Sequence, residues 1–139
     1  MARLADAPGS GHTGCRRMIC LAAGAVLVPL LGNTLTLAWT HSVEKILWEE
    51  DWRRTPQGLV IDEARVRGSG AGMEPPPEAR LKDGVWSWKP GIPPQREVVL
   101  RRSGATADWR ICRERRCRPL GEVVPGDADP VVMTACDQP

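Results

Sequence analysis

Hydrophobic and polar residues alternate along several short segments of the chain, and this period of two is typical of β-strands with one buried face. Residues 34–40 alternate leucine and tryptophan with threonine and alanine. Residues 46–52 place two tryptophans and Glu50 on one face, and the other two carboxylates on the opposite face. Both segments are therefore predicted as strands.

Further strands are predicted along the rest of the chain. Residues 55–58, Thr-Pro-Gln-Gly, have the composition of a turn, so the second strand is expected to form an antiparallel hairpin with a strand over residues 59–67. Shorter strands are predicted over 85–88, 97–101 and 109–112, and a seventh over 117–120 is an open alternative. This spacing predicts an all-β fold, a small antiparallel sandwich or open barrel of six to seven strands.

The N-terminal region lacks this alternation. Arg16 and Arg17 precede an uncharged run of 14 residues, 18–31. The run is short for a membrane span of about 20 residues, but it fits the apolar region of a signal peptide. An uncleaved membrane anchor is the alternative. We therefore predict a signal or anchor helix within residues 1–32, a β domain over 33–121 and an irregular tail over 122–139.

Composition narrows the class of protein. The chain has 139 residues, with 13 prolines and 14 glycines, which favours turns over long helices and excludes a coiled coil or a multidomain enzyme. The formal net charge is only +2, which argues against nucleic acid as a partner. Eight arginines lie within residues 96–118, and four acidic residues follow without a basic residue near them. This region is either a solvated basic hairpin beside an acidic tail or a docking patch for acidic lipid or an acidic partner.

The five cysteines and six tryptophans add two expectations. Cys112 and Cys117 flank a four-residue polar loop and are predicted to form a disulfide across a hairpin. Cys20 is assigned to the leader, and Cys136 is expected to be free or bonded to a partner. No metal site is expected, because Cys112 and Cys117 lack the second pair of ligands that common zinc sites have. There is no phenylalanine or tyrosine, so the tryptophans are expected to fill the core, with a carbohydrate-stacking platform as the alternative.

Four segments together resemble the bacterial family catalogued as domain of unknown function 1850. They are Leu-Thr-Leu-Ala-Trp-Thr-His-Ser-Val-Glu-Lys (35–45), Trp-Glu-Glu (48–50), Ala-Arg-Val-Arg-Gly-Ser-Gly-Ala-Gly-Met (64–73) and the segment 112–120. The resemblance implies a small exported or membrane-anchored protein, with a gene often beside a tripartite (TRAP-type) transporter that uses a TAXI-type receptor. It implies a non-enzymatic periplasmic accessory role, with a receptor or permease subunit as the partner and no cofactor. We expect the protein to be soluble or anchored to the inner membrane through residues 16–32.

Polar residues cluster where the first two predicted strands meet, beside a glycine-rich segment. The candidate residues for partner or ligand binding are His41, Ser42, Glu44, Lys45, Glu49, Glu50, Arg67, Ser69, Gly70 and Gly72. Maintenance of the fold is the alternative role for this cluster, and a free-standing periplasmic domain that binds a small ligand is the alternative function.

A hydrolase is the third hypothesis for the same cluster. His41 would be the base, Ser42 the nucleophile, and Glu50 or Glu63 the carboxylate that orients the base. Adjacent side chains of a strand point to opposite faces, which disfavours proton transfer between His41 and Ser42. The expectation is therefore a protein that is not an enzyme.

Overall fold

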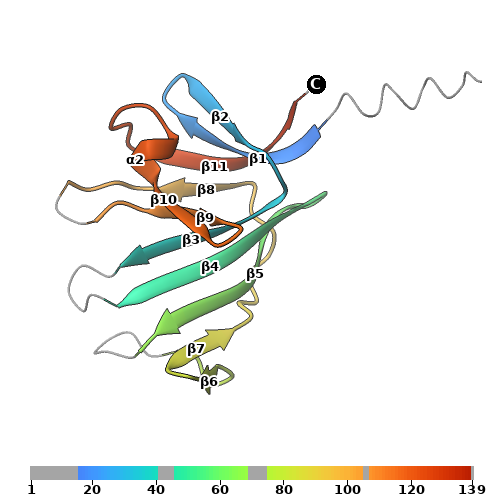
Figure 1. The fold of residues 1–139 in the computed structure, drawn as a ribbon. Helices are drawn as coiled ribbons and strands as arrows, with labels where there is room; N and C mark the ends of the chain where they lie inside the picture. Colours follow the sequence, from blue (N-terminus) through green and yellow to red (C-terminus); the bar gives the residue numbers. More distant parts are fainter. Residues whose placement is uncertain (1–15, 41–45, 69–74, 105–106, 139) are drawn as a thin grey trace, which may run out of the picture.

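The computed structural model describes residues 16–40, 46–68, 75–104 and 107–138, and these residues form eleven strands and one short helix (Figure 1). In chain order the elements are β1 (Arg16–Ala23), β2 (Val26–Leu30), β3 (Thr34–Thr40), β4 (Leu47–Thr55), β5 (Gly58–Arg67), β6 (Arg80–Lys82), β7 (Val85–Trp88), β8 (Glu97–Leu100), β9 (Arg110–Arg113), β10 (Arg116–Pro119), α2 (Leu120–Val123) and β11 (Val131–Gln138). The predicted all-β class is confirmed, although six or seven strands was too few.

The strands form two antiparallel sheets and no closed barrel. The small sheet has the order β2-β1-β11-β8, and the large sheet has the order β10-β9-β3-β4-β5-β7-β6. The small sheet lies across the β9–β3 end of the large one, and β5, β7 and β6 extend away from it (Figure 1). One face of the large sheet is therefore covered along only part of its width.

The hairpin of β4 and β5 shows how the sequence sets the pairing. Thr55 pairs with Gly58 across the predicted turn. Gly58 has a φ of +132°, and a Cβ there would lie 2.7 Å from the carbonyl oxygen of Gln95, so the position requires glycine. β4 and β5 therefore form the predicted antiparallel hairpin, and its register shifts between Asp51 and Trp52.

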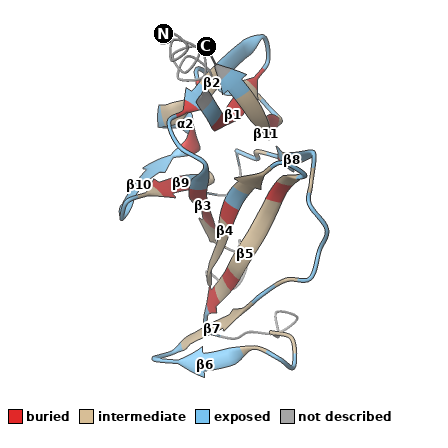
Figure 2. Ribbon diagram, turned by 90° about the vertical axis from the view of Figure 1, so that its right-hand side faces the viewer, coloured by how far each residue is buried: buried red, intermediate tan, exposed pale blue. Residues whose placement is uncertain are grey.

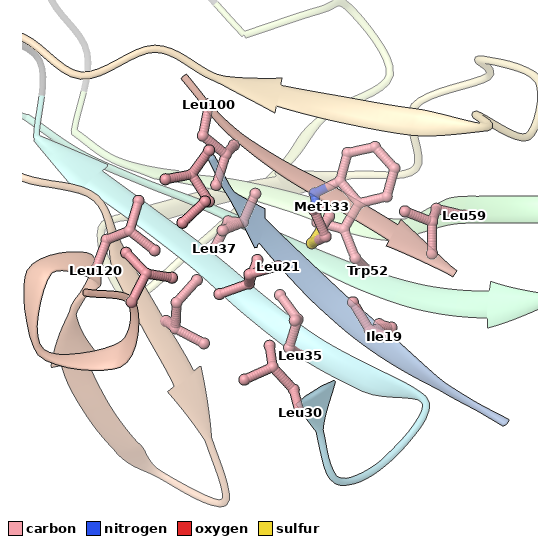
Figure 3. Close-up of a cluster of buried hydrophobic side chains, with 14 residues drawn as sticks. Ile19, Leu21, Leu30, Leu35, Leu37, Trp52, Leu59, Leu100, Leu120 and Met133 are labelled. Carbon is pink, nitrogen blue, oxygen red and sulfur yellow. The ribbon is translucent and has the colours of Figure 1, made fainter. Parts of the chain in front are cut away.

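The main core lies between the two sheets. Leu21 of β1 and Met133 of β11 face Leu37 of β3, and Leu100 and Leu120 close the cluster from β8 and α2 (Figure 3). Each of these side chains is at most 1% exposed. Burial of aliphatic side chains from seven strands and the short helix is the main source of stability of the fold.

The predicted helix over the apolar run is wrong, because the structure places the two strands β1 and β2 there. Ile19 and Leu21 face the core, and Gly24, with a φ of +63°, lies in the turn of the hairpin. Met18 and Cys20 on the other face of β1 are also buried. A strand buried on both faces has a continuous apolar sequence, and such a run resembles the apolar region of a signal peptide.

The predicted irregular tail is also wrong over residues 131–138. β11 lies between β1 and β8 in the small sheet, with eight register pairs to β1. Val131 and Met133 are fully buried. The charge of this segment suggested a solvated tail, but Asp137 forms an ion pair with Arg54 at 2.8 Å.

Two disulfides link neighbouring strands, one in each sheet. Cys112 and Cys117 are bonded between β9 and β10, with their Cα atoms 4.0 Å apart, as predicted. Cys20 and Cys136 form a second disulfide between β1 and β11, across 116 residues of sequence. The assignment of Cys20 to a leader and the expectation of a free or intermolecular Cys136 are therefore corrected.

Arg54 of β4 joins the two sheets beside this second disulfide. Its guanidinium donates hydrogen bonds to the carbonyl oxygens of Met18, at 3.0 Å, and of Cys136. Its ion pair with Asp137 completes the contact, and the Arg54 side chain is only 14% exposed. One arginine thus binds both strands that the disulfide links.

The two disulfides differ in the loops that they close, and this difference is testable. We expect Cys20→Ser with Cys136→Ser to lower the free energy of unfolding by about 4–5 kcal/mol, because the closed loop is long. The double variant Cys112→Ser with Cys117→Ser opens a short loop, and we expect it to lower the free energy of unfolding by about 2 kcal/mol. Urea denaturation without reductant measures both values, and equal losses in the two double variants would contradict the prediction.

Candidate functional site

The two faces of the large sheet separate the polar residues that the sequence had grouped. Glu49 and Arg67 lie on the outer face, where a guanidinium nitrogen of Arg67 is 3.6 Å from a carboxylate oxygen of Glu49. Glu50 is the next residue of β4 after Glu49, and it faces the opposite side. The predicted cluster is therefore not a single site on one surface.

The outer face carries an ion-pair network centred on Arg65. Its guanidinium donates to Asp51 at 2.7 and 2.8 Å, to Glu63 at 2.6 Å and to Glu49 at 3.3 Å. The hydrogen bonds from Arg65 hold the pKa of Asp51 below its ordinary value, against the effect of burial, and Thr36 assists. Each of these carboxylates already has Arg65 as an ion-pair partner. This face therefore suits structural support of the sheet better than a catalytic or binding role.

The inner face of the large sheet carries the tryptophans. Trp52 is 4% exposed and belongs to the main core, as expected of all six. The other five are only partly buried. The core under the small sheet reaches Leu59 at the start of β5 but no residue of β7, which lies far from the small sheet (Figure 2). The expectation that the tryptophans fill the core is therefore correct for Trp52 and in part for Trp109, which packs half-buried against the main core.

Four of these partly buried rings touch one another in a row across the sheet, which we call the tryptophan face. Trp109 contacts Trp39 at a centroid distance of 5.0 Å, and Trp39 stacks on Trp48 at 6.1 Å. Trp48 meets Trp88 edge-on at 6.0 Å. The row thus runs from the start of β9 through β3 and β4 to β7.

Small residues of β5 explain how two of these rings can meet. Trp48 of β4 and Trp88 of β7 lie on strands that β5 separates. The β5 residues between them, Ala64 and Val66, are buried, and each pairs with a tryptophan of β7. The side chains of β5 are short enough for the indoles to cover them, which leaves an aromatic surface above.

Glu50 lies on the same inner face, between apolar partners. Its register partners are Leu37 and Ala64, and its carboxylate accepts a hydrogen bond from the indole nitrogen of Trp52 at 3.1 Å. Burial raises the pKa of the Glu50 carboxyl above its ordinary value, and the bond from Trp52 opposes that rise. A carboxyl in this position can hold a proton more readily than an exposed one, or can accept a donor from a bound molecule.

Two further features adjoin the tryptophan face. The indole nitrogen of Trp48 is buried and has no hydrogen-bond partner within the part of the chain that the structure describes. A cavity of about 120 Å³ lies beside Trp39 and Trp109, with Arg101 and Arg102 on its wall. Arg102 forms an ion pair with Asp108 at 3.0 Å. The side chain of Arg101 is 71% exposed.

Seven of the predicted site residues lie outside the described residues: His41, Ser42, Glu44, Lys45, Ser69, Gly70 and Gly72. The strands that flank them are described. β3 ends at Thr40 opposite Leu47 of β4, and β5 ends at Arg67, so these strand ends meet at the end of the sheet that holds Trp39 and Trp48.

Sequence reasoning named Glu50 as a candidate site residue and gave the tryptophans a binding role only as the alternative of a carbohydrate-stacking platform. The alternation had placed Trp39, Trp48 and Trp88 correctly on inward faces. It could not show how far the covering sheet extends over the large one. Their number, with no phenylalanine or tyrosine beside them, was the available signal.

The described residues hold no group of three or more His, Cys, Asp or Glu side chains that could bind a metal ion. Within the same residues, no helix has both the length and the apolar character needed to cross a membrane.

The pKa of Glu50 gives a test of its burial. The folded state binds the proton more tightly than the unfolded state, so burial of the ionised carboxylate lowers stability as the pH rises above about 4.5. Glu50→Gln removes the charge and keeps an oxygen for the Trp52 N–H. We expect this variant to have a higher free energy of unfolding than the parent at pH 7, and the difference to disappear below about pH 4.5.

Urea denaturation across this pH range makes the measurement. Glu97→Gln is the matched control, because Glu97 is exposed on β8 and should show no such gain. A higher free energy of unfolding for Glu50→Gln that does not change with pH would contradict the prediction.

A family model described as a domain of unknown function (DUF1850) matches residues 35–120, more than half of the chain. The match contains β3 to β10, and β1, β2 and β11 lie outside it. No curated protein and no solved structure matches the chain.

Proposed function

We propose, from the premise that this chain belongs to the DUF1850 family, that it is a non-enzymatic binding module of the cell envelope. The partner proposed is the receptor or permease subunit of a TRAP-type uptake system that uses a TAXI-type receptor. The choice of partner rests on the resemblance of residues 35–120 to exported proteins encoded beside such transporters.

The observation that carries the binding role is the tryptophan face. Four touching indoles lie on a half-covered sheet face, although a small domain would gain stability by burying them. Tryptophan is enriched among residues that dominate the energy of protein interfaces. The ion pairs of the opposite face, in contrast, are satisfied within the chain.

The disulfides support the envelope as the place of action. Four cysteines are paired, and such bonds persist in oxidising compartments such as the periplasm. Because β1 and β2 are part of the core, we propose that residues 18–30 stay in the working protein.

A small ligand is a second candidate for the same face. The buried Trp48 N–H is a donor without a partner among the described residues, and Glu50 supplies a carboxyl nearby on the same face. A compact ligand with an apolar body and one hydrogen-bond acceptor would suit this combination.

Cross-linking of the tagged full chain in its native envelope, with identification of partners by mass spectrometry, tests the first proposal. We expect a transporter receptor or permease subunit to be recovered. Trp88→Ala should reduce the recovery at least about tenfold, since loss of one interface tryptophan costs about 2 kcal/mol. Arg53→Ala is the matched control, because Arg53 is exposed in a pair with Asp62 on the outer face.

The outcomes separate the two candidates. Equal recovery of transporter subunits with both variants would show that the tryptophan face is not part of the contact. Recovery of the protein alone, together with stabilisation by a small-molecule library member that Trp88→Ala abolishes, would favour the small ligand.

A further inference from the structure

We propose that the hairpin of β9 and β10, which we call the basic hairpin (residues 110–119), docks on the anionic surface of a membrane. This inference goes beyond the binding role of the tryptophan face and does not rest on it.

The basic hairpin concentrates unpaired positive charge. Its ten residues contain five arginines and one acidic residue, Glu114. Arg118 lies 3.9 Å from Glu122. The other four arginines, Arg110, Arg113, Arg115 and Arg116, have no ion pair within the described residues. Figure 2 shows the hairpin extending sideways from the sheet with β10 exposed.

The C-terminal acidic residues do not neutralise this charge. Asp137 is paired with Arg54, and Asp129 lies 3.7 Å from Arg101 and accepts the backbone N–H of Arg102. Glu122 is paired with Arg118, so the solvated hairpin beside an acidic tail keeps one counter-charge, and the other four arginines have no ion pair within the described residues.

The local structure of the hairpin tip is unfavourable for stability. Arg113 and Arg116 are direct register partners, and like charges opposite each other destabilise a strand pair. The turn residues Glu114 and Arg115 have φ values of 51° and 68°, where glycine and asparagine are preferred. Residues kept in such conformations are concentrated at functional sites.

The disulfide offsets these costs. Cys112 and Cys117 are the register pair next to Arg113 and Arg116, so the bond holds the tip closed. A charged tip that is already ordered loses less conformational entropy when it meets a surface.

An exposed aliphatic side chain beside the arginines favours a membrane over an acidic protein. Leu31 is 62% exposed and lines the same hollow as Arg113. A Cβ at the neighbouring Gly32 would lie 2.9 Å from the Arg113 guanidinium, so the β2–β3 turn and the hairpin are in contact. Arginines that meet lipid phosphates while a leucine enters the acyl boundary form a common interfacial arrangement.

Sedimentation of the full chain with lipid vesicles tests the proposal. We expect binding to vesicles of phosphatidylcholine mixed with phosphatidylglycerol, weak binding to phosphatidylcholine alone, and a steep loss of binding between about 0.05 and 0.5 M salt. Arg115→Ala with Arg116→Ala should weaken binding about 30-fold, from about fivefold for each arginine.

Arg80→Ala with Lys82→Ala is the matched control, because it removes the same charge from β6, where both side chains are exposed. It should change binding less than about twofold. Leu31→Ser should weaken the binding that remains at high salt. Thermal melts should show the Arg115 and Arg116 variant at least as stable as the parent, because like-charge repulsion is relieved.

Equal losses in the two double variants would overturn the proposal, since total charge would then explain binding. Equal binding to the neutral and anionic vesicles would overturn it too. So would cross-linking of Arg115 or its neighbours to an acidic protein in the absence of vesicle binding, because the hairpin would then be a protein interface.

Discussion

The pairing of β1 with β11 is the constraint on which the rest of the molecule depends. These strands come from opposite ends of the described chain, and the Cys20–Cys136 bond fixes them side by side. Their inward side chains supply one half of the main core, and Arg54 connects both of them to the large sheet. Without this pair, β2 and β8 lack their only neighbours in the small sheet, and the inner face of β3 and β4 loses its cover.

The limited extent of the small sheet also explains the tryptophan face. Trp52 is sealed in the core, whereas Trp48, on the same strand, and Trp88 of β7 are only partly buried. Glu50 lies between Trp48 and Trp52 on that strand. A single β-strand, β4, therefore carries a core residue, a half-buried carboxyl and a half-buried aromatic ring in consecutive inward positions.

Local patterns predicted the large sheet well, because its strands alternate in polarity and its hairpins use short turns. Residues 34–40 were predicted with the observed bounds, and the Cys112–Cys117 bond followed from the hairpin. β1 and β11 were missed because their identity depends on each other. An apolar run becomes a strand buried on both faces only when a distant partner pairs with it. The sequence could not decide between a tryptophan core and a tryptophan platform for the same reason, since the extent of the covering sheet is a long-range property.

The position of β11 also determines when the chain can close. It is the most C-terminal strand of the described residues, yet it occupies an inner place in the small sheet. β3, β4 and β5 are joined by local hairpins and can associate early, whereas β1 and β2 can form only an isolated pair, which is marginally stable in water. The nascent protein is therefore expected to stay open, with apolar surface accessible to chaperones and proteases, until β11 has left the ribosome.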